Sequence, residues 1–254
     1  MHVAPLQSRP LIPPHDDVRT ALVDALGTLG EQSVIAISSK VVAIGEGRCV
    51  SIPDGEDPIA FKDALVARES ELFIPRDRSA PNGRAFTITD GTLISSAGID
   101  RSNGNGYLIL WPEDPMSAAA SLRTFLMEHF QVAVLGVLIT DSAGAPLRNG
   151  VRGITIGYAG FHAQCDYRGT PDIFGRLLAA ERLNVADSLA ATAVLAMGEG
   201  KECTPFVCMT DIPHITFTST ESDDPYLTLK VSREHDVFAT FFDHAPWQKG
   251  GRHE

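Results

Sequence analysis

The sequence predicts an α+β fold, in which helices and strands follow one another without strict alternation. Three observations support this prediction. Four segments have the apolar spacing of helices, several short apolar runs have the length of strands, and the run from Val132 to Ile139 is apolar on both faces. Such a run is typical of a central strand that is covered on both sides. We therefore expect helices and strands to share one core.

Four segments are predicted to be helical. In residues 16–26, Asp16 and Asp17 can cap the helix, the apolar side chains recur on one helix face, and Gly27 can end it. The other predicted helices are residues 59–72, 117–130 and a long helix over 174–196.

Short apolar runs predict the strands, at residues 34–37, 41–44, 85–89, 93–95, 107–110, 132–139, 206–209 and 215–218. No repeat and no low-complexity linker interrupts the chain. We expect one composite domain over residues 1–210, followed by an extension over residues 211–254. From Glu221 onwards this extension is acidic and only weakly periodic.

Length and composition exclude several classes of protein. The chain has 254 residues, of which 44% are hydrophobic and 21% charged, as in ordinary globular proteins. Its net charge of −11 disfavours binding to nucleic acid or to an anionic membrane. No apolar run spans a bilayer, and the N-terminus has no signal-peptide pattern. We expect a cytoplasmic protein whose cysteines are reduced thiols, namely Cys49, Cys165, Cys203 and Cys208.

Basic residues are unevenly distributed. Eleven arginines and no lysine lie between Lys62 and Lys201. Because a guanidinium binds carboxylates and phosphates through two parallel hydrogen bonds, this bias fits a site for an anionic ligand. A GC-rich genome would produce the same bias, and the sequence alone leaves both explanations open.

Three carboxylates stand in contexts that suggest chemistry. Asp100 follows a predicted strand, Asp141 emerges at the end of the buried run, and Glu199 lies between two glycines after the last predicted helix. Carboxylate oxygens are the ligands that Mg²⁺ and Mn²⁺ prefer. Each residue also has an ordinary structural explanation, since Asp100 suits a turn and Glu199 suits a solvated helix end. The chain has no Walker loop, HExxH, GxSxG or paired Cys/His spacing.

Several longer motifs resemble one known family, the coenzyme F-420 gamma-glutamyl ligases. They occur in order over about residues 3–210: RPLIPPHDD (9–17), SSKVVAIGEGR (38–48), SSAGIDRSN (95–103), PEDP (112–115), ITDSAGAPLRNG (139–150), DYRGTPDIFGR (166–176), VADSLAATA (185–193) and MGEG (197–200). The resemblance implies a mixed-sheet α+β fold and an intertwined homodimer. It also implies a GTP-dependent ligase that joins the amino group of L-glutamate to a carboxylate of a deazaflavin precursor.

The resemblance further implies the site residues. Asp100 and Asp141 would be catalytic and hold one Mg²⁺ or Mn²⁺, and Ser142 and Glu199 would help to hold a second. K⁺ is a further possible cation, and ATP stays open as an alternative to GTP. The nucleotide would contact Ser8, Arg9, Pro10, Leu11, Ser39, Lys40, Asn103, Met197, Gly198, Glu199, Gly200, Lys201, Glu202, Cys203 and Thr204.

Three features depart from the family pattern. Ile44 stands where the family has a nucleotide-binding lysine, the connection from Arg48 to Glu71 is short, and the C-terminal segment differs. Two alternatives therefore stay open. One is the same ligase chemistry on another acceptor, such as a folate or pterin. The other is a homologue that binds nucleotide or cofactor without catalysis.

Overall fold

The computed structural model describes residues 1–77, 79, 83–219, 224 and 227–252. Its centre is a five-stranded sheet in the order β1 (His2–Leu6), β12 (Phe206–Thr210), β2 (Ser33–Ser38), β8 (Leu135–Gly144) and β9 (Val151–Ala159). Strands β2 and β8 run parallel, and the other neighbours are antiparallel. The sheet is therefore mixed, as the resemblance implied, and the α+β class is confirmed.

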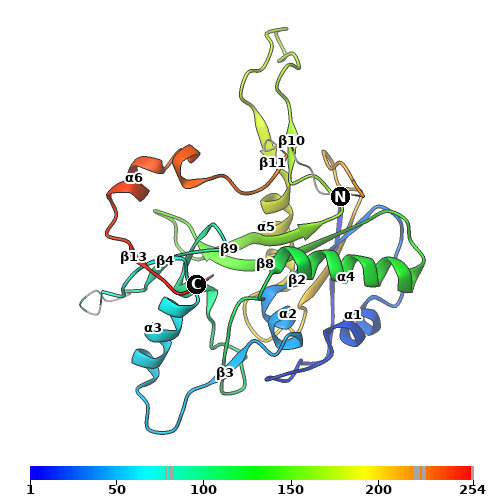
Figure 1. Ribbon diagram of the computed structural model, residues 1–254. Coiled ribbons are helices and arrows are strands. Elements are labelled where there is room, and N and C mark those ends of the chain that lie inside the picture. The colour runs from blue at the N-terminus through cyan, green and yellow to red at the C-terminus, as the bar shows by residue number, and fades with distance from the viewer. Residues whose placement is uncertain (78, 80–82, 220–223, 225–226, 253–254) are drawn as a thin grey trace.

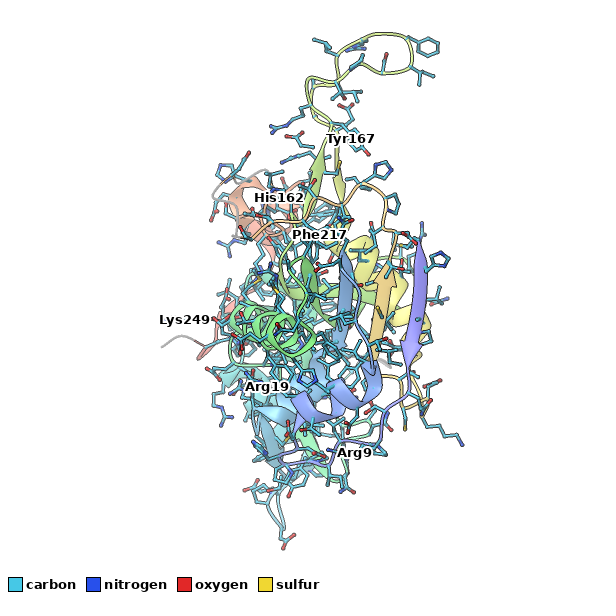
Figure 2. The ribbon with its side chains drawn as sticks, turned by 90° about the vertical axis from the view of Figure 1, so that its right-hand side faces the viewer. Arg9, Arg19, His162, Tyr167, Phe217 and Lys249 are labelled. Atoms are coloured by element: carbon cyan, nitrogen blue, oxygen red, sulfur yellow. The ribbon has the colours of Figure 1, made fainter. Side chains whose placement is uncertain are left out.

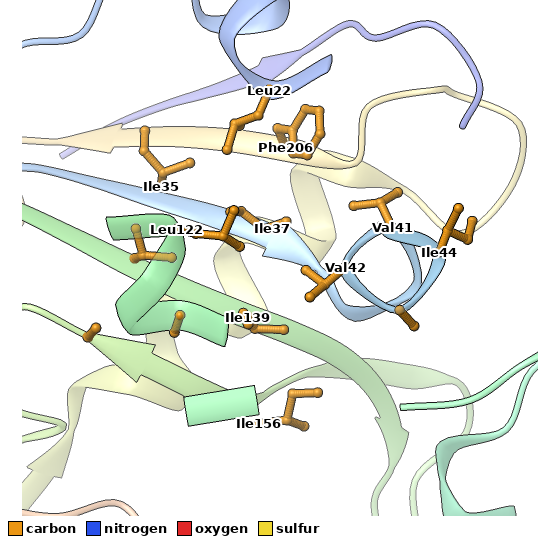
Figure 3. Close-up of a cluster of buried hydrophobic side chains, with 14 of the residues drawn as sticks. Leu22, Ile35, Ile37, Val41, Val42, Ile44, Leu122, Ile139, Ile156 and Phe206 are labelled. Atoms are coloured by element: carbon orange, nitrogen blue, oxygen red, sulfur yellow. The ribbon is translucent and has the colours of Figure 1, made fainter. Parts of the chain in front are cut away.

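Helices cover both faces of this sheet (Figure 1). One face packs against α1 (Val18–Leu26), α2 (Ser39–Gly45) and α4 (Pro115–Phe130), and the other packs against α5 (Val185–Met197). Because side chains alternate along a strand, Ile37 and Ile139 enter the first layer (Figure 3), whereas Leu138 enters the second. The run predicted as a covered central strand is thus β8, although the strand begins at Leu135 and extends to Gly144.

A second sheet lies beside the first. Its order is β13 (Gln248–Lys249), β4 (Leu72–Ile74), β5 (Phe86–Thr89) and β6 (Thr92–Ser95), all antiparallel. Helix α3 (Pro58–Arg68), the 3₁₀ turn η1 (Ser96–Gly98) and the pair β3 (Cys49–Ser51) and β7 (Tyr107–Ile109) form a small core with it. The end of the predicted extension thus returns to this sheet through β13, after η2 (Arg233–His235) and α6 (Ala239–His244).

Strands β10 (Gln164–Asp166) and β11 (Arg182–Asn184) form the base of a projecting arm (Figures 1 and 2). The sequence predicted a helix over residues 174–196, and its first part is wrong. Asp172 accepts hydrogen bonds from the backbone N–H groups of Phe174 and Arg176, which makes a turn, and Asn184 caps the helix that begins at Val185. Of the apolar residues that suggested a helix before Val185, Leu177 and Leu183 are exposed and Leu178 is half-buried.

Three other expected elements differ. Residues 41–44 were predicted as a strand but belong to helix α2. The prediction failed because an apolar run this short and this fully buried has no periodicity that distinguishes a strand from a helix. The helix predicted over 59–72 ends at Arg68, and Leu72 already belongs to β4. Residues 215–218 form only a bridge between Phe217 and Phe161. No helix among the described residues is long and apolar enough to cross a membrane.

Candidate functional site

A cavity of about 700 Å³ lies where β2 and its parallel pairing with β8 end, at Ser38 and Thr140. Parallel strands bring their carboxyl ends to one edge of a sheet, where ligand sites commonly form. The register of β8 against β9 shifts between Ile139 and Thr140, just before Asp141. The extra residue, Ile156, lies in β9, and β8 keeps its alternation through this point, because Ile139 and Ala143 belong to the same core layer. The other walls come from the N-terminal segment, α2, α3, the residues around η1 and the loop after α5.

The structure brings nearly all predicted site residues to this cavity. The lining includes Arg9, Pro10, Leu11, Ser39, Lys40, Asp100, Asn103, Asp141, Ser142, Met197, Gly198, Glu199, Gly200, Lys201, Glu202, Cys203 and Thr204. Ser8 is not part of the lining, but its backbone N–H donates to the carbonyl oxygen of Cys203 at 2.9 Å. The N-terminal segment and the loop after α5 are therefore joined behind the cavity wall.

Asp100 is held as an ionised carboxylate. Its Oδ2 accepts a hydrogen bond from Lys40 Nζ at 2.7 Å and from the Ser102 hydroxyl at 2.6 Å. Its Oδ1 accepts from the backbone N–H groups of Arg101 and Ser102. Burial alone would raise the pKa of Asp100, but the bonds from Lys40 and Ser102 outweigh it and lower the pKa to about 2.

Asp141 has the opposite electrostatic environment. Burial raises its pKa to about 6, and the negative charge of Asp100 acts in the same direction. Trp111 Nε1 donates to its Oδ2 at 2.5 Å, and the Ser142 backbone N–H donates to its Oδ1 at 2.8 Å. The Trp111 indole is 2% exposed and lies against Gly98, where an added Cβ would be 1.9 Å from Nε1. Two neighbouring carboxylates thus differ strongly in their affinity for a proton.

The third carboxylate, Glu199, reaches the same region from the loop after α5. Its Oε1 accepts a short hydrogen bond from the Ser142 hydroxyl. The loop is folded tightly, because Glu202 accepts the Gly200 N–H at 2.8 Å and Thr204 donates to the Met197 carbonyl at 2.7 Å. Asn103 Nδ2 donates to the Gly200 carbonyl at 2.8 Å. This bond connects the Asp100 segment to the loop.

The N-terminal wall is fixed by one carboxylate. The two terminal nitrogens of Arg9 each donate to an oxygen of Asp16 at 2.7 Å, and Asp16 also accepts the backbone N–H of Ile12. The hydrogen bond from Arg9 is the largest influence on Asp16 and holds its pKa well below the usual range. Asp16 therefore orders the segment that carries Arg9, Pro10 and Leu11 into the cavity.

Comparison with known proteins shows the family to which the chain belongs. The chain matches the family model described as F420-0:Gamma-glutamyl ligase over residues 8–211. The chain belongs to the F420-0:gamma-glutamyl ligase family.

Three relatives named coenzyme F420:L-glutamate ligase illustrate the similarity. The protein of Methanopyrus kandleri is 33% identical over 82% of this chain and 85% of its own length. The protein of Methanothermobacter thermautotrophicus is 30% identical over 92% of this chain and 96% of its own length. The protein of Haloarcula marismortui is 35% identical over 83% of this chain and 87% of its own length. The similarity thus extends over most of each chain.

The donor set of this gamma-glutamyl ligase family member suits a hard divalent cation. Asp100, Asp141, Glu199 and the Ser142 hydroxyl offer only oxygen atoms, and all four line the one cavity. Within the described residues, however, no group of three or more His, Cys, Asp or Glu side chains is arranged as a metal site. Asp100 is bonded to Lys40, Asp141 to Trp111 and Glu199 to Ser142. The residues fit the cation in chemistry, and these polar partners hold them at the cavity.

The structure also shows site residues that sequence reasoning missed. Lys62, Arg84 and Ser96 line the cavity, and Trp111 supports Asp141 from behind. Lys62 and Trp111 stand in no motif, so no local signal marked them. Ile44, which replaces the expected lysine, is 2% exposed and is part of the core as well as the cavity wall (Figure 3).

Proposed function

We propose that this protein is a nucleotide- and divalent-metal-dependent ligase that forms an amide bond between L-glutamate and a carboxylate of a coenzyme F420 precursor. One observation supports this most directly. Asp100, Asp141 and Glu199 come from three distant parts of the sequence and line one cavity together with the expected nucleotide segments. The name shared by the relatives, coenzyme F420:L-glutamate ligase, supports L-glutamate as one substrate and the coenzyme F420 class as the other.

The chemistry requires an activated acyl group, because a carboxylate is a poor acyl donor. In the proposed reaction an oxygen of the acceptor carboxylate attacks the γ-phosphorus of GTP, and GDP leaves. The amino nitrogen of glutamate then attacks the acyl phosphate, the C–O bond to phosphate breaks, and the amine gives up a proton. The products are an amide, inorganic phosphate and GDP. Catalysis of such transfers is mainly positioning and neutralisation of charge.

Particular residues suit each part of this reaction. Asp100, Asp141, Ser142 and Glu199 would hold Mg²⁺ or Mn²⁺, which neutralises phosphoryl oxygens when bound. Lys40 adds a fixed positive charge, since its Nζ is bonded to Asp100 Oδ2 and to the carbonyl of Ser102. The segment Met197–Thr204 and Arg9 would border the nucleotide. K⁺ would be an additional cation, and ATP is the alternative nucleotide.

We also propose that the active form is a homodimer assembled through the arm. Ile173 and Phe174, at its tip, are 91% and 89% exposed. Large apolar side chains grouped in this way are typical of protein interfaces. In Figure 2, Tyr167 at the base of the arm lies in the upper part of the molecule and Arg9 at the cavity lies in the lower part. An interface formed by the arm would therefore leave the cavity open to substrates.

The direct test measures phosphate release with Mg²⁺ or Mn²⁺ and L-glutamate. It compares GTP with ATP, and the coenzyme F420 precursor with folate. Acceptor-dependent release with a glutamate-sized mass increase supports the ligase and names its acceptor. Nucleotide binding without release under any combination contradicts it and favours the non-catalytic homologue.

Two variants show whether release depends on this cavity. Asp141→Asn keeps the size of the side chain and removes its charge, so we expect a loss of at least about 100-fold in rate. Asp54→Asn changes an exposed aspartate outside the cavity lining and serves as the matched control. Equal rates in both variants would remove Asp141 from the mechanism.

A further inference from the structure

Five basic residues line the cavity, and their surroundings differ. Arg9 is paired with Asp16, and Lys40 is paired with Asp100. Lys201 lies in the loop after α5, among the expected nucleotide residues. Lys62 and Arg84 belong to none of the expected nucleotide segments, because they come from α3 and from the residues just before β5. They therefore form a separate basic part of the wall.

Lys62 is anchored in this wall. Its Nζ donates to the carbonyl oxygen of Ile99 at 2.8 Å, and its side chain is half-buried. Ile99 immediately precedes Asp100, and the charge of Asp100 acts on the ammonium group, so Lys62 lies near one of the two proposed catalytic carboxylates. An ammonium group has three N–H donors, and the bond to Ile99 uses one of them. Among the residues that the structure describes, no other hydrogen bond of Lys62 is found, which leaves two donors for a ligand.

Arg84 is a stronger candidate for direct contact with a ligand. Its side chain is exposed and lines the cavity, and no described residue forms an ion pair or hydrogen bond with its guanidinium. Burial lowers the pKa of Lys62, the negative charge of Asp100 raises it, and the positive charges of Arg76 and Arg84 lower it. Arg76 is neutralised by Asp63, with its Nε 3.0 Å from Oδ1. An anion placed between Lys62 and Arg84 would relieve the repulsion between them.

We propose that Lys62 and Arg84 form a subsite for an acidic group, a carboxylate or a phosphate, of a substrate other than the nucleotide. The subsite would orient that substrate toward Asp100, since the bond from Lys62 to the Ile99 carbonyl holds the ammonium group beside the residue that precedes Asp100. This inference rests on the proposed ligase function. It adds a specificity determinant on the small-sheet side of the cavity.

The subsite is tested by calorimetry, which measures the Kd of each substrate for the wild type and for variants. The titrants are the coenzyme F420 precursor, L-glutamate and GTP with Mg²⁺, each added separately. In Arg84→Gln we expect the Kd of either the precursor or L-glutamate to rise roughly 10-fold to 100-fold, as for loss of a charged hydrogen bond. The Kd of GTP should stay unchanged. The titrant that responds identifies the source of the acidic group.

Three further variants control the interpretation. Arg84→Lys keeps the charge and should retain part of the affinity that Arg84→Gln loses. Lys62→Met should raise the Kd of the same substrate that Arg84→Gln affects. Lys201→Met, in the loop after α5, should raise the Kd of GTP instead. Arg148→Gln removes an exposed arginine outside the cavity lining and should leave the Kd values of the precursor, L-glutamate and GTP unchanged.

Two results would overturn the subsite. One is an unchanged Kd for both precursor and L-glutamate in Arg84→Gln, and the other is an effect confined to GTP. Failure of the ligase proposal looks different. Wild type would then release no phosphate, while an Arg84-dependent affinity for precursor or glutamate would still support the subsite. A wild type that binds neither substrate contradicts both proposals.

Discussion

Replacing Gly98 by alanine should destabilise the protein through the indole of Trp111. An added Cβ would lie 1.9 Å from Nε1 and 2.4 Å from Cδ1 of that ring, whereas ordinary contacts begin at 3.4 Å. The ring would therefore have to move by about 1.5 Å in a close-packed interior. Because it is 2% exposed and donates to Asp141 at 2.5 Å, it cannot move without losing this hydrogen bond.

Three contributions set the size of the effect. Alanine in the left-handed region, at the φ of +68° found for Gly98, costs roughly 1 kcal/mol. Overpacking a buried site costs about 1–3 kcal/mol. Removing the indole donor from the buried carboxylate of Asp141 costs about 1–3 kcal/mol more. We expect the free energy of unfolding to fall by about 3–6 kcal/mol in total, because these effects are only partly additive.

Gly27→Ala is the matched control for this substitution. Gly27 has φ +62° and ψ −53°, and nothing lies within 4 Å of an added Cβ, so only the backbone strain of this turn applies and no side chain has to move. Urea unfolding followed by circular dichroism gives both values. If Gly98→Ala is no more destabilising than Gly27→Ala, the contact between Gly98 and Trp111 does not constrain the fold and the reasoning fails.

Three other predictions concern the ends of the chain and the arm. Arg252→Ala should lower the free energy of unfolding by about 2–4 kcal/mol, because the Arg252 side chain is 6% exposed and pairs with Asp90 at 2.8 Å; a loss below about 0.5 kcal/mol, as at ordinary surface sites, would contradict this. Phe174→Ser should convert a dimer to a monomer in sedimentation without lowering the unfolding midpoint of the monomer, and unchanged mass would remove the arm from the interface. Asp16→Asn should destabilise the protein at neutral pH. Since the folded pKa of Asp16 is lowered, its contribution is present above the ordinary carboxyl pKa near 4 and declines as pH falls below it, so a difference from wild type that grows on acidification would refute the assignment.

The sequence predicted the acidic side of the site for a physical reason. Glu199 follows helix α5 in a loop, the kind of segment where ligands often bind. Asp141 lies within β8, directly after Thr140, the last residue that pairs with β2, so it stands where the covered part of the strand ends. The partners of these carboxylates could not be predicted. Lys40 meets Asp100 across 60 residues and Trp111 meets Asp141 across 30, and neither pairing leaves a periodic pattern in the chain.

The errors in the predicted fold have a common origin. Residues 41–44 and 174–181 both contain apolar side chains whose burial depends on something outside the segment. In the first case the neighbouring sheet and helices bury every apolar residue, so no face is left to show a period. In the second case Phe174 and Leu177 are exposed in this chain, and their spacing reflects no packing against its core. Periodicity is informative only where one face is buried and the other is not.

The pairing of both sheets has a consequence for synthesis on the ribosome. Among the strands that the structure describes, β1 pairs with β12 alone, which is made about two hundred residues later, and β4 pairs early with β5 but gains its second neighbour, β13, only after about 170 further residues. A nascent chain that stops short of β12 therefore leaves the edge of β2 unpaired, and an open edge promotes association between chains. We expect slow translation of the second half to favour aggregation, and a chaperone that covers open strand edges to act chiefly before β12 has emerged.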